Sequence, residues 1–140
     1  MNQKYRGFTL LELLVVIVII GLLAAYVGPR YFSQIGRSQI QVTRAQIDGF
    51  DKALDQYRID TGHYPTTDLG LVALISQPAN EPNWHGPYLK KNIPLDPWGS
   101  AYFYRQPSSE INREYDLISY GRDGKSGGTG EDADISAATN

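Results

Sequence analysis

A run of about twenty apolar residues begins at Phe8 and contains a single carboxylate, Glu12. At roughly 1.5 Å per residue, a helix of this length can cross the hydrocarbon core of a bilayer. An ionised carboxylate costs on the order of 2.5–3.5 kcal/mol at the centre of such a helix, and less near its end. Because the run holds no cationic side chain, the sequence predicts that Glu12 pairs with a cation from outside the segment.

Two ordinary explanations of this segment fit it poorly. A secretory signal peptide has an apolar core of about 7–15 residues that ends at a small-residue cleavage site, but this core is longer, and residues 24–26 (AAY) match such a site poorly. A simple single-pass anchor would keep Lys4 and Arg6 in the cytoplasm. In either case the chain would have no use for Glu12.

Cleavage ahead of the apolar run is the third explanation. A cut between Gly7 and Phe8 would create a new amine at Phe8, with a pKa near 8, so that it is mostly protonated at pH 7. This amine would supply the cation that Glu12 lacks.

The string GFTLLE at residues 7–12 resembles the processing site of type IV pilin-like proteins. The resemblance implies that a prepilin peptidase cuts after Gly7 and methylates the nitrogen of Phe8, which keeps its positive charge. It further implies that Glu12 pairs with a terminal amine while the apolar helices pack together into a filament.

The next segment, residues 29–62, has the pattern of an amphipathic helix. Pro29 removes a main-chain donor and is expected to kink or break the helix that precedes it. Gly62 is expected to cap the C-terminal end, so that the helical pattern ends at Thr61. The predicted buried stripe follows spacings of seven, three, four and three residues and consists of Ile40, Ile47, Phe50, Leu54 and Tyr57.

The remaining residues, 63–140, are expected to form a small globular head. A short helix is predicted before Pro78, capped by Thr66, Thr67 or Asp68. Five prolines between residues 78 and 97 indicate an irregular loop, in which Trp84, Tyr88 and Trp98 are expected to hold the loop to the helix. Segments 101–105 and 114–120 are aromatic and β-branched and are predicted strands. The expected fold class is α+β, with a leader at 1–7, an apolar helix at 8–28 and an amphipathic helix at 29–62.

Three stretches carry a closer resemblance, namely residues 54–74, residues 86–99 and the acidic tail. They resemble the major pseudopilins, or core protein G, of bacterial type II secretion systems. The resemblance implies a type IV pilin-like fold and a helical homopolymer, the pseudopilus, that drives folded periplasmic proteins across the outer membrane. The implied partners are minor pseudopilins, the prepilin peptidase and an inner-membrane assembly platform. The implied location is the inner membrane, crossed once, with the head in the periplasm.

The tail after residue 120 combines glycines with acidic side chains, five of its residues 121–130 being glycine. Calcium prefers six to eight oxygen ligands from carboxylates and backbone carbonyls. The EF-hand spacing is absent because Lys125 stands where its second acidic ligand would be. From the residues alone, a flexible acidic loop is the simpler interpretation.

The resemblance to pseudopilins favours calcium in this loop. The implied ligands are the side chains of Asp123, Asp132 and Asp134, with the backbone carbonyls of Tyr120 and Lys125. Whether Glu131 also binds the ion is left open, as is any role for the last five residues.

Other functions are poorly supported by the sequence. The absence of cysteine excludes disulfides, thiolate zinc sites and thiol nucleophiles, and a formal net charge of -2 without a basic patch argues against nucleic-acid binding. His63 and His85 are expected to be structural or exposed. The sequence predicts a structural subunit rather than an enzyme. The alternatives are a type IV pilin, which usually carries a cysteine pair, and a membrane-tethered periplasmic binding module, which would have no use for Glu12.

Overall fold

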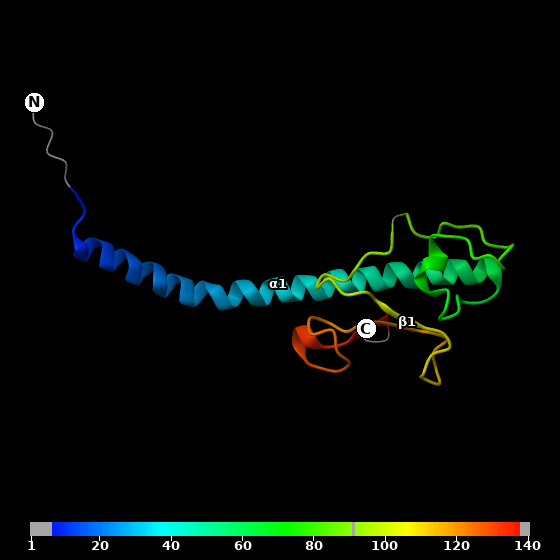
Figure 1. The fold of residues 1–140 in the computed structure, drawn as a ribbon. Helices are drawn as coiled ribbons and strands as arrows, with labels where there is room; N and C mark the ends of the chain where they lie inside the picture. Colours follow the sequence, from blue (N-terminus) through cyan, green and yellow to red (C-terminus); the bar gives the residue numbers. More distant parts are fainter. Residues whose placement is uncertain (1–6, 91, 138–140) are drawn as a thin grey trace, which may run out of the picture. The chain divides into compact units, whose positions relative to one another are not determined.

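The computed structural model describes residues 7–90 and 92–137, so most of the predicted leader lies outside the described residues. The chain divides into two compact units, Met1–Gly36 and Arg37–Asn140. Figure 1 shows the elements in chain order, and the ordered elements are α1 (Leu10–Thr61), η1 (Gly70–Leu74), β1 (Phe103–Arg105), β2 (Asp116–Ser119), η2 (Gly130–Asp132) and β3 (Ile135–Ser136).

Helix α1 is one element of 52 residues, and it continues through Pro29. It begins two residues after Phe8, where the apolar helix was predicted to start. The predicted end at Thr61 is confirmed: Gly62 follows with a φ of 87° and donates its N–H to the Arg58 carbonyl at 2.7 Å. Of the two effects expected of Pro29, a kink or a break, the break does not occur, because proline removes one donor while neighbouring turns keep their hydrogen bonds.

The second unit builds its core on the predicted stripe of α1. Ile47, Phe50, Leu54 and Tyr57 are all buried, and Ile40 packs partly buried against the same cluster. The rest of the core comes from the head and includes Tyr64, Leu71, Leu74, Tyr102, Tyr104, Leu117 and Ile135. Burial of this stripe explains why a regular helix carries an otherwise irregular head.

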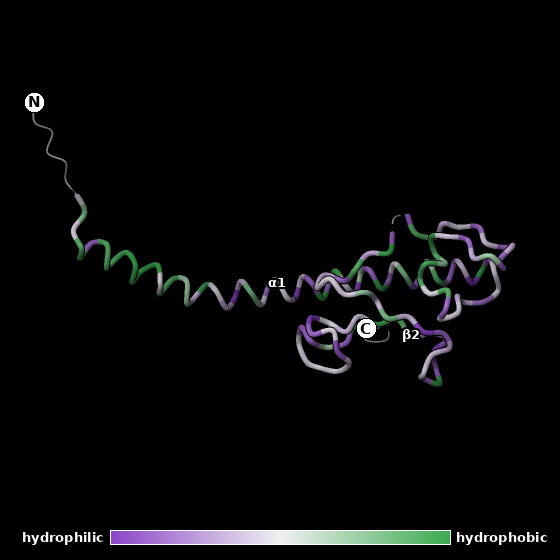
Figure 2. Tube along the Cα trace, viewed as in Figure 1, coloured by the Kyte–Doolittle hydropathy of each residue, from purple (hydrophilic) through white to green (hydrophobic). Residues whose placement is uncertain are grey.

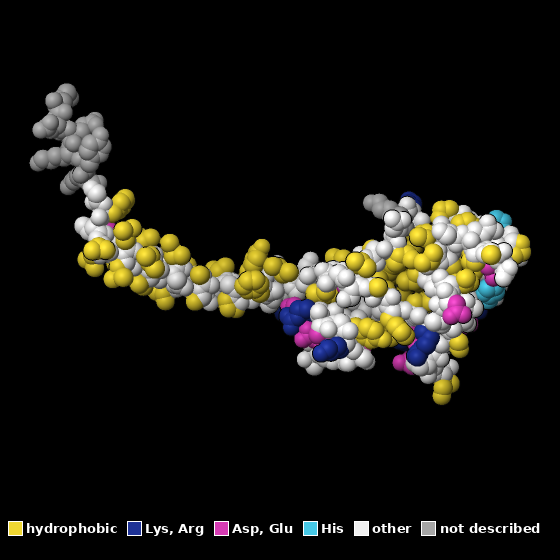
Figure 3. All heavy atoms as spheres, in the orientation of Figure 1, with side chains coloured by type: hydrophobic (Ala, Val, Ile, Leu, Met, Phe, Trp, Pro, Cys, Tyr) yellow, Lys and Arg dark blue, Asp and Glu magenta, His cyan; other side chains and the backbone are white. Residues whose placement is uncertain are grey.

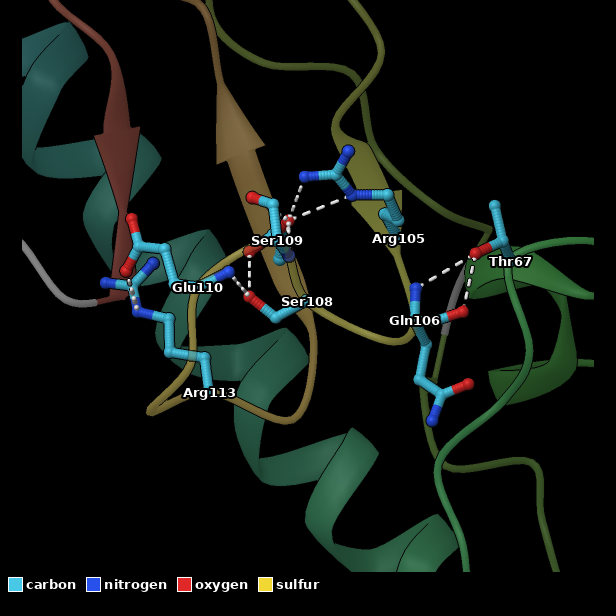
Figure 4. Close-up of polar contacts among 8 residues, drawn as sticks. Thr67, Arg105, Gln106, Ser108, Ser109, Glu110 and Arg113 are labelled. Carbon is cyan, nitrogen blue, oxygen red and sulfur yellow. Dashed lines mark hydrogen bonds and ion pairs between the residues drawn. The ribbon is translucent and has the colours of Figure 1, made fainter.

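The turn after α1 differs from its prediction. Element η1 is a 3-10 helix, and the residue before it, Leu69, makes no side-chain capping bond. The Thr66 carbonyl instead accepts the N–H groups of Leu69 and Gly70. Thr67 donates its hydroxyl to the Gln106 carbonyl and accepts the Gln106 N–H, both at 2.9 Å (Figure 4). The expected side-chain cap is therefore wrong, since Thr67 joins the turn to the segment after β1.

The proline-rich loop is irregular, as predicted, and aromatic side chains hold it to the rest of the head. Trp84 donates its indole N–H to the Ala73 carbonyl at 2.8 Å. The Tyr88 hydroxyl donates to Asp60 of α1 at 2.8 Å. Trp98 packs partly buried against the core. Tyr88 therefore holds the loop to α1 as expected, whereas Trp84 bonds to η1 and Trp98 packs against the core.

The sheet is antiparallel, with strand order β1-β2-β3. Both predicted strands exist but are shorter than their aromatic segments. In the first pair Phe103 lies opposite Ile118 and Arg105 opposite Asp116. The third strand was not predicted, because two residues after a glycine-rich loop give no alternating pattern. It pairs Ile135 with Ser119 and returns the acidic tail to the sheet.

Candidate functional site

The first described unit exposes almost all of its side chains. Phe8 is 84% exposed, and the apolar residues from Leu10 to Val27 are about half exposed or more. By length and composition, α1 is apolar enough to cross a membrane. Figure 2 shows that hydrophobic residues predominate along the N-terminal part of the helix, and Figure 3 shows their side chains over its visible face. A surface of this kind requires lipid or partner helices to cover it.

Glu12 lies in the first turn of α1 and bonds to Thr9. Its Oε2 accepts the Thr9 main-chain N–H at 2.8 Å and the Thr9 hydroxyl at 3.1 Å, and the Glu12 N–H donates to Thr9 Oγ1 at 3.2 Å. This reciprocal pattern is a capping box. Thr9 is a site residue that our sequence analysis missed, although threonine followed three residues later by glutamate is the signal for this motif.

The surroundings of Glu12 are apolar. A surface groove beside its side chain is lined by Phe8, Leu11, Leu13, Val15 and Val16. When this surface is covered, the carboxylate loses water and depends more strongly on a cation. Both capping bonds end on Oε2, so among the described residues Oε1 receives no hydrogen bond.

The acidic tail is folded back on itself as a closed loop. The Arg122 N–H donates to the Glu131 carbonyl at 2.8 Å and joins the two ends. Gly121 and Gly128 have positive φ, and a Cβ at either position would lie within 2.6 Å of a backbone oxygen between residues 131 and 133. Only glycine permits this close approach. The loop therefore has a closed conformation that depends on glycine at residues 121 and 128.

The predicted acidic ligands have different partners in the loop. Asp123 accepts the Lys125 N–H at 3.1 Å. Asp132 accepts both Nε and Nη2 of Arg122, at 2.9 and 3.1 Å. Asp134 accepts the Gly127 N–H on Oδ2 at 3.0 Å, while its Oδ1 is buried without a hydrogen-bond partner among the described residues.

Arg122 is the second residue that sequence analysis missed. It also lies 3.1 Å from a Glu131 carboxylate oxygen. Asp132 and then Glu131 raise the pKa of its guanidinium, so it stays charged. A single arginine among acidic residues gave no pattern from which this double pairing could be expected.

The geometry of the loop limits how it could hold a metal ion. Within residues 7–90 and 92–137, no three acidic, histidine or cysteine side chains converge to form a metal site by themselves. Backbone carbonyls must therefore complete any site here, as the predicted ligand set requires. The unpartnered Oδ1 of Asp134 fits a cation, because a buried carboxylate oxygen needs one or a donor. Asp123 fits as well, whereas Asp132 must first exchange Arg122 for the ion.

The two histidines do not form a further site. His63 Nε2 lies 2.8 Å from a Glu81 carboxylate oxygen. His85 Nδ1 lies 2.6 Å from the Asn83 carbonyl oxygen. Both contacts lie within the head, in keeping with the structural or exposed role predicted for these residues.

Comparisons with known proteins agree along nearly the whole chain. Residues 30–138 match the family described as type II secretion system (T2SS), protein G, and residues 2–28 match the prokaryotic N-terminal methylation motif. Core protein G of Pseudomonas aeruginosa is 42% identical over 96% of this chain and 95% of its own length. Core protein G of Vibrio cholerae is also 42% identical, over 95% and 91%.

A solved structure is similar as well. The crystal structure of the major pseudopilin from the type 2 secretion system of enterohaemorrhagic Escherichia coli matches with a TM-score of 0.63 and 31% identity, covering 76% of this chain and 87% of that one. This match confirms the expected α+β, pilin-like fold, with one long N-terminal helix and a small antiparallel sheet.

Proposed function

The chain belongs to the protein G family of type II secretion systems and is a pseudopilus subunit, and on this premise we propose that it is the major subunit of a helical homopolymer. The filament drives folded periplasmic proteins across the outer membrane. The observation that carries the proposal is the uncovered apolar surface of α1, with one carboxylate near its start. Neither a type IV pilin nor a tethered binding module is favoured by an observation of similar weight.

Before assembly, the subunit crosses the inner membrane once. Lys4 and Arg6 precede the apolar helix, and basic residues beside a membrane helix favour the cytoplasmic side. The second unit, which holds the packed core, is then periplasmic. This topology places the sequence around Gly7 where a membrane-bound prepilin peptidase can reach it, and it leaves α1 accessible to an assembly platform and to minor pseudopilins.

The processing site is the bond between Gly7 and Phe8, with methylation of Phe8. The match of residues 2–28 to the methylation motif supports this assignment. A bulky side chain at Gly7 should block cleavage. We therefore expect Gly7→Val to accumulate with its leader attached, while Gly21→Val, a change into open space, is processed normally. Intact-mass spectrometry of membrane fractions containing the peptidase measures both. Processing of Gly7→Val as complete as that of wild type would refute the assignment.

Glu12 pairs in the filament with the terminal amine of a neighbouring subunit. The capping box occupies Oε2, and the apolar side chains around it exclude water once helices pack together. Removing one partner of a buried charge pair is strongly destabilising. The Thr9 bonds also add a local role that Glu12→Leu would lose, worth about 1 kcal/mol.

Assembly assays separate these two roles of Glu12. Glu12→Leu and Glu12→Gln should insert into the membrane as wild type does, yet each should lower filament yield by about tenfold or more. The amide keeps the shape and much of the capping but not the charge. If Glu12→Gln assembles fully, the charge pair is absent and only the capping role remains.

Calcium binds the ordered acidic loop. Asp123 and Asp134 would hold the ion together with the backbone carbonyls of Tyr120 and Lys125, and Asp132 would join after releasing Arg122. Asp134 supports this assignment because its Oδ1 is buried and unpartnered among the described residues. When bound, calcium would supply a positive charge that holds the two ends of the loop together. Asp123→Ala should remove this effect.

A further inference from the structure

Ile111 is the most exposed large apolar side chain among the described residues, at 102% of its reference exposure. It lies in the connection between β1 and β2, far along the chain from the apolar part of α1. Single exposed apolar residues are common. The loop that carries Ile111, however, is held by several side-chain hydrogen bonds.

Most of these bonds converge on Asp116, at the start of β2. Its side chain is 3% exposed. It accepts Nε and Nη2 of Arg105 at 3.0 and 2.6 Å, the Ser108 hydroxyl at 2.5 Å, and both the N–H and the hydroxyl of Ser109 at 3.1 and 3.2 Å. A loop fixed by this many bonds loses little entropy when it binds a partner.

The tip itself is also fixed. Figure 4 shows Ser108, Ser109, Glu110 and Arg113 joined in one polar network. The Glu110 N–H donates to the Ser108 hydroxyl at 2.9 Å, and the Glu110 carboxylate lies 3.3 Å from Arg113 Nε. The polar side chains at the tip are thus bonded within the loop, and the apolar side chain of Ile111 projects from it.

A complementary groove lies elsewhere on the same unit. It has a volume of about 300 Å³ and an almost wholly apolar surface, and it is lined by Gln46, Gly49, Phe50, Leu89, Lys90, Asn92 and Pro94. Lys90 forms no ion pair within the described part of the chain. The groove therefore offers an apolar floor beside Lys90. The tip offers an apolar side chain beside Glu110, whose carboxylate is 65% exposed although it lies 3.3 Å from Arg113, so it can also approach a second cation.

The two features cannot meet within one chain. In Figure 1 the loop near residue 90 and the β1–β2 connection lie on opposite sides of α1. The groove is level with Phe50, whereas Glu114 holds the hairpin beside Arg58 through an ion pair of 2.5 Å. Eight residues of helix correspond to roughly 12 Å along the axis. The groove and the tip can therefore meet only if they belong to two different copies of the chain.

We propose that Ile111 of one subunit inserts into the groove at Phe50, Leu89 and Pro94 of the next copy of this chain. The proposal rests on the homopolymer proposed above. A helical polymer requires a heterologous contact, in which two different patches of one chain meet their counterparts on neighbouring copies. The tip and the groove are such a pair, and the contact would fix the position of each head against its neighbour.

Cysteine cross-linking tests the contact, because the chain contains no cysteine of its own. Full-length Ile111→Cys/Asn92→Cys is assembled into filaments with its peptidase and platform and is then oxidised. We expect a ladder of disulfide-linked multimers. The single variants Ile111→Cys and Asn92→Cys should give no ladder. A dimer from Ile111→Cys alone would show that tips meet each other, which would overturn the proposal.

Substitution of Ile111 gives a second measurement. Ile111→Ser should raise the subunit concentration needed for assembly about tenfold or more, since a buried isoleucine side chain is lost from the contact. Ile111→Leu keeps an apolar knob and should assemble nearly as wild type does. Normal filaments from Ile111→Ser, with no ladder from the double cysteine variant, would overturn this contact but leave the homopolymer standing. A secretion defect in Ile111→Ser with normal filaments would indicate that Ile111 binds another partner, and this result would also overturn the proposed contact. If wild type forms no filament, both proposals fail.

Discussion

The Asp116 side chain carries a negative charge although it is almost fully buried. Its carboxylate lies opposite Arg105 in the register of β1 and β2. Burial by itself would raise its pKa, but hydrogen bonds from Ser108, Arg105 and Ser109 hold the pKa well below its usual range. The ionised form is therefore stabilised in the folded state more than in the unfolded chain.

This difference predicts acid sensitivity. Asp116 contributes stability that is present above its unfolded pKa, near 3.9, and that declines as the pH falls below about 5 toward the lower folded pKa. Asp116→Asn should lower the free energy of unfolding at pH 7 by about 3 kcal/mol and flatten its decline between pH 5 and 3. Urea unfolding at several pH values measures both effects.

Glu114→Gln is the matched control for Asp116→Asn. Glu114 also pairs with an arginine, Arg58 of α1, but the Glu114 side chain is 56% exposed. Exposed ion pairs contribute between about 0 and 1 kcal/mol. The acid dependence of Glu114→Gln should match that of wild type. An equal loss of stability in both variants would mean that the burial of Asp116 is unimportant.

Helix α1 combines two surfaces in one element. Before Val27 its apolar side chains are exposed, while after Ile40 a narrow stripe is buried under the head. The head is also tied to the helix by phenols, since the hydroxyls of Tyr64, Tyr88 and Tyr115 donate to Asp55, Asp60 and Asp51 at 2.8, 2.8 and 2.9 Å. Burial raises the pKa of Asp51 although the Tyr115 bond opposes this shift. Such bonds fix the rotation of the head about α1.

The buried stripe should dominate the stability of the second unit. Leu54 is 0% exposed, whereas Ile59, on the same helix, is 75% exposed. We expect Leu54→Ala to lower the free energy of unfolding by about 3 kcal/mol, the cost of a cavity in a packed core. Ile59→Ala should change it by less than about 0.5 kcal/mol. Chemical denaturation of both variants measures the difference, and similar values would place the core elsewhere.

Sequence patterns predicted those parts of the fold in which residues of one kind recur at a regular spacing. The spacing of Ile47, Phe50, Leu54 and Tyr57 identified the buried face of α1, and aromatic, β-branched runs identified β1 and β2. Strand β3 was missed, because its two residues are placed by pairing with Ser119 and Ile118 rather than by their own pattern. Thr67 was assigned to a cap because local chemistry cannot reveal that Gln106, 39 residues away, binds it instead.

The functional site divides in the same way, into a local motif that the sequence predicts and long-range contacts that it does not. The motif around Gly7 and Glu12 is local, so sequence alone could predict processing, and the match to the methylation motif confirms the motif itself. The acidic loop depends on contacts between its two ends. Arg122, which bonds to Glu131 and Asp132, could not be predicted from spacing. Its position decides which carboxylates are available to an ion.

At the scale of the whole molecule, the acidic loop has few means of staying folded. Of its residues 120–134, Gly121 alone is buried, and the chain has no disulfide. Ordering a residue costs about 1–2 kcal/mol of backbone entropy. The Arg122 pairs are exposed and contribute little. The Oδ1 of Asp134 is meanwhile buried without a partner among the described residues, which is itself unfavourable. A bound cation would relieve this penalty and close the loop.

Calcium should therefore raise the melting temperature of the full chain in detergent, followed by fluorescence of its two tryptophans, which both lie in the head. At a hundredfold excess over Kd the gain is about 2.7 kcal/mol, or roughly 10 °C for a domain of this size. Magnesium should act weakly, since it demands a tighter octahedral site.

Asp123→Ala should melt like chelated wild type, whereas Asp68→Ala, which changes an exposed aspartate outside the loop, should keep the full response to calcium. Trypsin should cut after Lys125 faster in chelator. If wild type and Asp123→Ala melt alike in calcium, magnesium and chelator, Arg122 alone closes the loop and the ion has no role there.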